Sequence, residues 1–212
     1  GLGYPPRKIY GFHTEKDLNT LIQRRGRSGI TDLNINDEIT DREYQKRGIR
    51  ALCEHFNSNH RRGLLVMATG TGKTRVAISL TDVLMRNDWA KSILFLADRT
   101  ALVNQAAKNF AKLLPNTTTT ILNETREPDF DARIMFSTYQ TMINYIDSDT
   151  KKFSVGRFDL IIIDEAHRSV FGKYTAISVV QERIKFGIDV TNAITNSVKG
   201  PVEITSVQIE NI

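Results

Sequence analysis

Residues 64–74 constrain the fold of this chain more than any other stretch. Four apolar residues, 64–67, have the composition of a buried strand, and they run into a loop with two glycines that ends in Lys-Thr. Gly70 and Gly72 allow the backbone to turn tightly enough for consecutive N–H groups to point inward. The amphipathic segment that follows predicts a helix, whose free N–H groups and positive dipole end attract an anion. The stretch therefore predicts a phosphate-binding loop between a strand and a helix.

The residue types at the end of this loop suit a triphosphate and its magnesium ion. Lys73 can place its charge against the outer phosphates, and the Thr74 hydroxyl can serve as a ligand for Mg²⁺. The predicted nucleotide-binding residues of the loop are Ala68, Thr69, Gly70, Thr71, Gly72, Lys73 and Thr74. The general form of such a loop has glycine where this chain has Met67, and the variant Ala-x-x-Gly-x-Gly-Lys-Thr resembles superfamily two helicases and translocases. The alternative is a glycine-rich turn without a function.

The composition fits one α/β domain with additional segments. The chain has 212 residues, of which 40% are apolar and 25% charged. No apolar run approaches the roughly 20 residues that span a bilayer, and the N-terminus lacks a signal-peptide pattern, so we expect a cytoplasmic protein without a membrane partner. The net charge of +5 is compatible with a polyanionic partner but does not prove one. Because the chain begins at Gly1 rather than Met, we expect it to be part of a longer protein or to carry a scar of processing.

Downstream of the loop, segments typical of strands alternate with segments typical of helices. Apolar or β-prone runs of strand length occupy residues 92–97, 117–122, 133–138 and 159–164. Amphipathic helical runs occupy residues 75–86, 101–114 and 139–146. Strands that are apolar throughout are covered by helices on both faces. The chain therefore predicts an α/β fold, a three-layer sandwich around a parallel sheet, with the reactive loops at the carboxyl ends of the strands.

A further helix is predicted to begin at Thr40, because Thr40 and Glu43 have the spacing of a capping box. Its apolar stripe comprises Tyr44, Ile49, Leu52, Cys53 and Phe56. Cys53 is the single cysteine, so it cannot form an intramolecular disulfide, which agrees with a reducing compartment. Its place on the stripe favours a buried core thiol over a catalytic one.

Gln45 lies in the first turn of this helix, about 25 residues before the phosphate-binding loop. Residues 42–45 resemble the adenine-recognising glutamine motif of superfamily two proteins. A side-chain amide carries a donor and an acceptor, which match the N6 and N7 edge of adenine. We therefore predict that Gln45 recognises adenine. The alternative is a solvated glutamine at the start of a helix.

Two carboxylates follow the last apolar strand. Asp164 and Glu165 would have little access to solvent there unless a cation or a partner were present. A phosphate-binding loop on a neighbouring strand would hold Mg²⁺ at this position, so Asp164 is predicted to anchor the metal and Glu165 to orient and deprotonate the attacking water. His167 is predicted to relay between the nucleotide site and the rest of the sheet. The predicted catalytic residues are Lys73, Asp164, Glu165 and His167, with Thr74 and Asp164 as metal ligands. By itself, Asp-Glu-Ala-His is also compatible with an ordinary helix start.

Four stretches together resemble the motor part of the restriction (R) subunit of type I restriction-modification enzymes. They are residues 64–74, 93–105, 136–142 and 158–169, and the last contains Asp-Glu-Ala-His-Arg-Ser. The resemblance covers roughly residues 40–177. It implies a RecA-like lobe, of the P-loop NTPase class, that uses ATP and Mg²⁺ to translocate double-stranded DNA. It also implies specificity and methylation subunits as partners.

The resemblance places the family's DNA contacts on Arg99, Ser137 and Thr138. The Arg99 guanidinium can pair with a phosphate, and the two hydroxyls can donate to the strand backbone. Such contacts would follow DNA without reading its bases. The alternatives are a surface cation for Arg99 and strand-end caps for Ser137 and Thr138.

The sequence divides into three parts. Residues 1–39 are predicted to form an arm, a short helix and a basic linker. The helix is capped by Thr14 and has Leu18, Leu21 and Ile22 on one face. The linker, residues 24–29, is either a DNA contact or a solvated loop. Residues 40–177 are predicted to form the motor lobe. Residues 178–212 are an unrecognised tail, with a helix predicted over residues 178–186 and two or three strands.

The resemblance ends near residue 177. The family's Thr-Ala-Thr strand is missing from the sequence, and too few residues follow for a second lobe. The second lobe supplies the arginine finger in such motors, so we expect the chain by itself to bind Mg-ATP weakly and to hydrolyse it slowly. The nuclease domain that precedes the motor in this family is also missing from the sequence, so we expect no cleavage of DNA. Two other functions stay open: another superfamily two helicase of DNA repair or RNA, and a non-catalytic truncated binding module.

Overall fold

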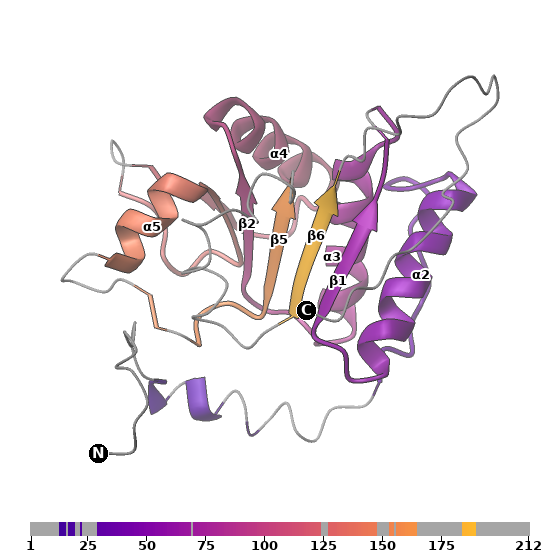
Figure 1. Cartoon of the computed structure of the whole chain (residues 1–212), viewed down its shortest axis with the longest axis horizontal. Coiled ribbons are helices and arrows are strands. Elements are labelled where there is room, and N and C mark those ends of the chain that lie inside the picture. Colours follow the sequence, from indigo (N-terminus) through magenta and orange to yellow (C-terminus); the bar gives the residue numbers. More distant parts are fainter. Residues whose placement is uncertain are drawn as a thin grey trace, which may run out of the picture.

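The computed structural model contains a sheet of six parallel strands in the order β1-β6-β5-β2-β4-β3 (Figure 1). It describes residues 13–15, 17–19, 22, 29–68, 70–123, 127–147, 153–154 and 156–164, together with the backbone of Ile184–Asp189. The strands are β1 (Arg62–Val66), β2 (Ile93–Ala97), β3 (Thr119–Ile121), β4 (Ile134–Thr138), β5 (Leu160–Asp164) and β6 (Ile184–Asp189). The helices that cover the sheet are α2 (Glu43–Asn57), α3 (Lys73–Arg86), α4 (Thr100–Leu113) and α5 (Tyr139–Asp147).

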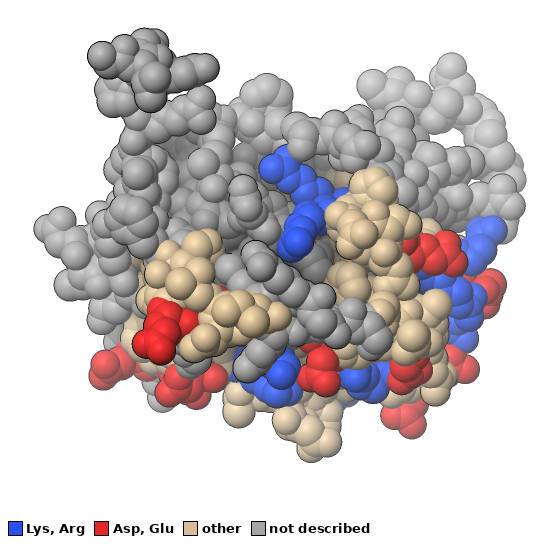
Figure 2. Space-filling model, turned by 90° about the horizontal axis from the view of Figure 1, so that it is seen from below, with Lys and Arg blue, Asp and Glu red and all other residues tan. Residues whose placement is uncertain are grey.

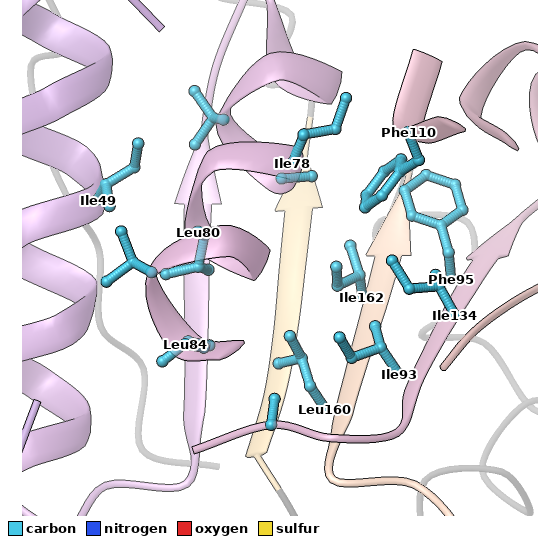
Figure 3. Close-up of a cluster of buried hydrophobic side chains, with 14 of the residues drawn as sticks. Ile49, Ile78, Leu80, Leu84, Ile93, Phe95, Phe110, Ile134, Leu160 and Ile162 are labelled. Carbon is cyan, nitrogen blue, oxygen red and sulfur yellow. The ribbon is translucent and has the colours of Figure 1, made fainter. Parts of the chain in front are cut away.

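Helices bury both faces of the sheet. Successive side chains of a strand point to opposite faces, so one strand contributes to the core on each side. In β2, Ile93 and Phe95 belong to a core cluster with α2, α3 and α4, whereas Leu94 and Leu96 belong to a second cluster with α5. Figure 3 shows the first cluster, with side chains of α3 and α4 packed over the strands. This arrangement confirms the predicted three-layer α/β sandwich, and it explains why β2 is apolar at every position.

Strand β6 corrects the predicted helix over residues 178–186. The backbone of residues 184–186 is extended, and β6 pairs with β1 on one side and β5 on the other. The physical reason is that apolar Ile184, Phe186 and Ile188 alternate with other residues, which is the period of a strand rather than a helix. Residues 178–183 lie outside the described part. The sheet of the lobe therefore extends beyond residue 177, where the sequence analysis ended it.

The lobe also begins before residue 40. Ile30, Ile35 and Ile39 are buried in the first core cluster, although the sequence analysis assigned them to an N-terminal arm and linker. The Asn57 side chain holds this segment to the end of α2, since its Oδ1 accepts from Ile30 N at 2.7 Å and its Nδ2 donates to Ile30 O at 3.1 Å. Residues 29–39 are therefore part of the lobe.

The predicted capping box at Thr40 is wrong. Helix α2 begins at Glu43, with Arg42 at its N-cap and no side-chain cap. Thr40 is buried instead, and its hydroxyl donates to the Arg75 carbonyl at 3.3 Å. Contact with α3 therefore outweighs the local capping preference of threonine.

The short N-terminal helix begins as predicted, because the Thr14 hydroxyl accepts a hydrogen bond from Asp17 N at 3.2 Å. Its apolar face is not covered, since Leu18 and Ile22 are 49% and 63% exposed. Leu21 and residues 24–28 of the basic linker lie outside the described part. Within the described helices, none is both long enough and apolar enough to cross a membrane.

Cys53 lies fully buried in the first core cluster, as predicted for a core thiol. Burial raises the pKa of its thiol from the ordinary value of 9.0 to about 12. Only the thiolate reacts as a nucleophile. The geometry and the ionisation state therefore both exclude a nucleophilic role for Cys53 in the folded chain.

This pKa predicts both reactivity and pH dependence. At about pH 8, iodoacetamide should leave the native chain unlabelled and should label Cys53 rapidly in concentrated urea, as followed by mass spectrometry. Because the folded pKa is raised, the contribution of the thiol to stability is complete below the unfolded pKa of 9.0 and declines as the pH rises toward about 12. Equal labelling rates for native and unfolded chain would contradict the buried thiol.

Candidate functional site

The predicted phosphate-binding loop connects β1 to α3. Gly70 and Gly72 have φ angles of 79° and 87°, in the left-handed region that favours glycine. The backbone N–H and the hydroxyl of Thr71 both donate to the Ala68 carbonyl, at 3.4 and 2.6 Å. Gly72 precedes α3 without a side-chain cap, and the first turn of α3 contains no acidic residue. The first N–H groups of α3 are therefore suited to an anionic ligand, while Thr69 lies outside the described part.

The two glycines have different surroundings. A Cβ atom built on Gly70 would meet nothing within 4 Å. A Cβ atom on Gly72 would lie only 2.4 Å from the Nε2 atom of Gln45. Glycine at position 72 therefore suits the backbone conformation, and a Cβ atom there would displace the terminal amide of Gln45 from its position beside the loop.

Helix α2 contacts the loop through adjacent residues of its first turn. Gln45 is 2% exposed, and its Nε2 donates to the Thr71 carbonyl at 2.7 Å. The Tyr44 hydroxyl donates to the same carbonyl at 2.9 Å, and it accepts from Arg42 Nη1 at 2.8 Å. The hydrogen bond to Tyr44 raises the pKa of Arg42. Recognition of adenine by Gln45 stays a prediction, and the structure adds a contact between Gln45 and the phosphate-binding loop.

The contact of Tyr44 was not predicted from the sequence, in which Tyr44 belongs to the apolar stripe of the helix. A tyrosine within such a stripe carries a hydroxyl group that usually needs a partner when it is buried. This was the available signal, and here the partner is the Thr71 carbonyl.

Asp164 ends strand β5 at the same edge of the sheet as the loop. The two were predicted to lie on neighbouring strands, which is wrong, because β6 lies between β1 and β5. In register, Asp164 pairs with Ile188, which pairs with Leu65 of β1. Two strand spacings correspond to about 9–10 Å, so the Asp164 backbone lies that far from β1. The order of strands arises from crossovers that a local sequence pattern does not specify.

The surroundings of Asp164 are only partly described. Its side chain is half-buried, and its carbonyl accepts a hydrogen bond from the Tyr139 hydroxyl at 3.3 Å. Glu165 and His167 lie outside the described part, so their predicted roles stay predictions. Within the described residues, no group of three or more His, Cys, Asp or Glu side chains is gathered to hold a metal ion.

The residues predicted to contact DNA also lie at the carboxyl ends of the strands, but their side chains differ in exposure to solvent. Arg99 precedes α4, and its side chain is 69% exposed, with Nε 3.7 Å from Asp98 Oδ2. Ser137 is fully buried, and its hydroxyl donates to the Thr138 carbonyl at 3.0 Å. The Thr138 hydroxyl accepts from Thr141 N at 3.2 Å, at the start of α5. A DNA contact stays a prediction for all three, and for Ser137 it requires that the side chain become exposed.

The opposite end of the sheet has a mixed surface. Figure 2 shows this side of the molecule, where the described Lys and Arg side chains are interspersed with Asp and Glu. Surface ion pairs occur between such side chains near the end of α3 and the start of β2, including Arg86 with Asp82 at 3.0 Å and Lys91 with Asp88 at 3.7 Å. The described part of this face therefore lacks the single-sign field that favours a nucleic-acid backbone.

Comparisons with a protein family and with individual proteins both point to subunits of restriction enzymes. Residues 38–193 match the family described as "Type III restriction enzyme, res subunit". The chain is 38% identical over 130 residues to the type I restriction enzyme EcoAI endonuclease subunit of Escherichia coli, covering 60% of this chain and 16% of that protein. It is 34% identical over 137 residues to the EcoKI endonuclease subunit of Escherichia coli strain K12, covering 62% of this chain and 12% of that protein. The chain thus spans only a small part of these relatives.

A solved structure supports the same fold. The helicase domain of Pyrococcus furiosus Hef matches with a TM-score of 0.59 and 24% identity, covering 77% of this chain and 35% of that chain. At this level of identity, the likeness concerns the fold. It agrees with the predicted RecA-like parallel sheet.

The two loop glycines offer a matched pair of substitutions. Gly70→Ala and Gly72→Ala both place a side chain at positive φ, which costs about 1–2 kcal/mol. Gly72→Ala also displaces the Gln45 amide from the Thr71 carbonyl, so its free energy of unfolding in urea should fall further, by a total of about 2–3 kcal/mol. Equal losses of stability for the two variants would show that the Gln45 side chain moves aside without a cost.

Proposed function

The chain belongs to the family of the type III restriction enzyme res subunit, and we propose that it forms the ATP-binding first motor lobe of an ATP-dependent DNA translocase, the restriction subunit of a type I restriction-modification enzyme. One observation carries the proposal. The phosphate-binding loop at residues 70–74 and the Asp164 carboxylate lie at the same edge of one parallel sheet. This is the edge at which open α/β sheets bind their ligands.

The residues of the loop fit a triphosphate. Two glycines at positive φ and an uncapped helix start present backbone N–H groups, and Lys73 adds a positive charge at the head of α3. The first turn of α3 contains no carboxylate that would repel a phosphate. Gln45 approaches the loop from α2, where its remaining amide hydrogen and its carbonyl oxygen can face the adenine edge.

The donor set also fits magnesium. The Thr74 hydroxyl and the Asp164 carboxylate are oxygen ligands, which Mg²⁺ prefers, and Asp164 would act through water molecules across the distance set by β6. Mg²⁺ would neutralise charge on the outer phosphates. Glu165, next to Asp164 in the sequence, would orient the attacking water and accept its proton, and His167 would transmit the state of the site to the sheet.

The proposed polymer partner is double-stranded DNA. Arg99, exposed at the start of α4, would contact a phosphate of its backbone, and Thr138 would contribute a hydroxyl at the neighbouring strand end. Specificity and methylation subunits are the further partners proposed from the type I relatives. Sequence recognition would then belong to another subunit.

Substitution of Lys73 tests the nucleotide site. Lys73→Ala should weaken binding of Mg-ATP by about tenfold or more, because it removes a charge-assisted contact to phosphate, and isothermal titration calorimetry can measure this. Lys108→Ala is the matched control, since Lys108 is exposed on α4, and it should leave the affinity unchanged. Equal and negligible affinity of wild type and Lys73→Ala would favour the alternative of a non-catalytic binding module.

We further propose that the 212-residue chain tested alone turns ATP over slowly and does not cut DNA. The expected results are phosphate release close to the background rate and no nicks in supercoiled plasmid incubated with Mg²⁺ and ATP. Nicked plasmid would contradict the second expectation. In a protein that contains both lobes, stimulation of the ATPase by double-stranded DNA rather than RNA would separate the translocase from an RNA helicase.

A further inference from the structure

We propose that Tyr44 is a positioning residue that orients the peptide group between Thr71 and Gly72 for phosphate binding. The proposal rests on the proposed function, because it concerns the loop to which ATP is assigned. The Tyr44 hydroxyl and Gln45 Nε2 donate to the same Thr71 carbonyl oxygen, at 2.9 and 2.7 Å. Two adjacent side chains of α2 therefore hold one carbonyl group of the loop.

The orientation of that carbonyl determines the orientation of an N–H group. The Thr71 carbonyl and the Gly72 N–H belong to one planar trans peptide group, in which the two bonds point in opposite directions. Because α2 attracts the carbonyl to its own side, the N–H is turned away from α2. Within the part of the chain that the structure describes, the Gly72 N–H donates no hydrogen bond. It is thus free to donate to an anion held in the loop.

The loop needs such a constraint because its backbone is permissive. Thr71 lies between Gly70 and Gly72, which both have positive φ angles. The peptide group between Thr71 and Gly72 turns about the ψ angle of Thr71 and the φ angle of Gly72. Glycine adopts several φ values at similar energy, so the Gly72 side offers little steric resistance to this rotation. Hydrogen bonds to the Thr71 carbonyl select one of these orientations before any ligand binds. Preorganisation of this kind lowers the entropic cost of binding.

Arg42 strengthens the constraint from the solvent side. Its Nη1 donates to the Tyr44 hydroxyl at 2.8 Å, and this hydroxyl in turn donates to Thr71. A cationic donor polarises the hydroxyl that it contacts and makes it a stronger donor itself. The three groups form a hydrogen-bond chain that begins with a charged side chain and ends at the loop.

The test compares two tyrosine-to-phenylalanine variants in the 212-residue chain. Tyr44→Phe removes only the hydroxyl and keeps the ring. Tyr145→Phe is the matched control, since the Tyr145 hydroxyl also donates to a backbone carbonyl, that of Asn123 at 3.3 Å, but within the cluster on the α5 face. Calorimetry gives the affinities for Mg-ATP, Mg-GTP and inorganic tripolyphosphate with Mg²⁺. A ¹H–¹⁵N spectrum follows the Gly72 amide during titration with tripolyphosphate.

Tyr44→Phe should lower the affinity for all three ligands by the same factor. The factor should be about three- to tenfold, which corresponds to the loss of one neutral hydrogen bond. The ratio of ATP to GTP affinity should stay as in wild type, and the Gly72 amide should shift less on addition of tripolyphosphate. Tyr145→Phe should match wild type within about twofold.

Three results would overturn the proposal. Unchanged tripolyphosphate affinity in Tyr44→Phe, with binding intact in wild type, would remove the positioning role and leave the proposed function standing. A loss confined to ATP would assign Tyr44 to the nucleoside instead of the loop. Failure of the wild-type chain to bind either ATP or tripolyphosphate would reject the proposed function itself, and the positioning role with it.

Discussion

Parallel pairing of all the described strands is the constraint on which the candidate site depends. Because the strands share one direction, the loop after β1, the carboxylate at the end of β5 and the helix starts after β2 and β4 all lie at one edge. A parallel sheet needs cover on both faces, which the layer of α2, α3 and α4 and the opposite helix α5 supply. The position of the charged groups is therefore a consequence of how apolar side chains are buried.

Much of this fold could be predicted because its signals are local. Apolar runs of strand length correspond to β2, β4 and β5, and the two glycines before Lys-Thr mark the loop at its observed place. The order of the strands has no local signal, so the separation of β1 from β5 by β6 was not foreseen. Prediction from short-range patterns fails wherever a contact between distant segments stabilises the fold more than the local preference does.

Individual site residues illustrate the same limit. Thr40 has the spacing of a helix cap, yet burial against α3 gives its hydroxyl a different acceptor. Ser137 was predicted as a DNA contact from its position in the family resemblance, and the local pattern gave no sign that the fourth residue of β4 is fully buried. Tyr44 was treated as an apolar position, yet its hydroxyl donates to the carbonyl of Thr71, which lies 27 residues later in the sequence. For Thr40 and Tyr44, the deciding hydrogen-bond partner lies on another element.

The position of β6 also has a consequence for how the chain acquires its structure. Among the described strands β6 is last in sequence, yet it lies second in the sheet, between β1 and β5. During synthesis, both of these strands must wait with an unpaired edge until residues 184–189 leave the ribosome. Only then does β1 acquire a fixed spacing from β5 and from the described strands beyond it. Assembly of the ligand-binding edge is thus a late event of folding, coupled to the closure of a long chain segment.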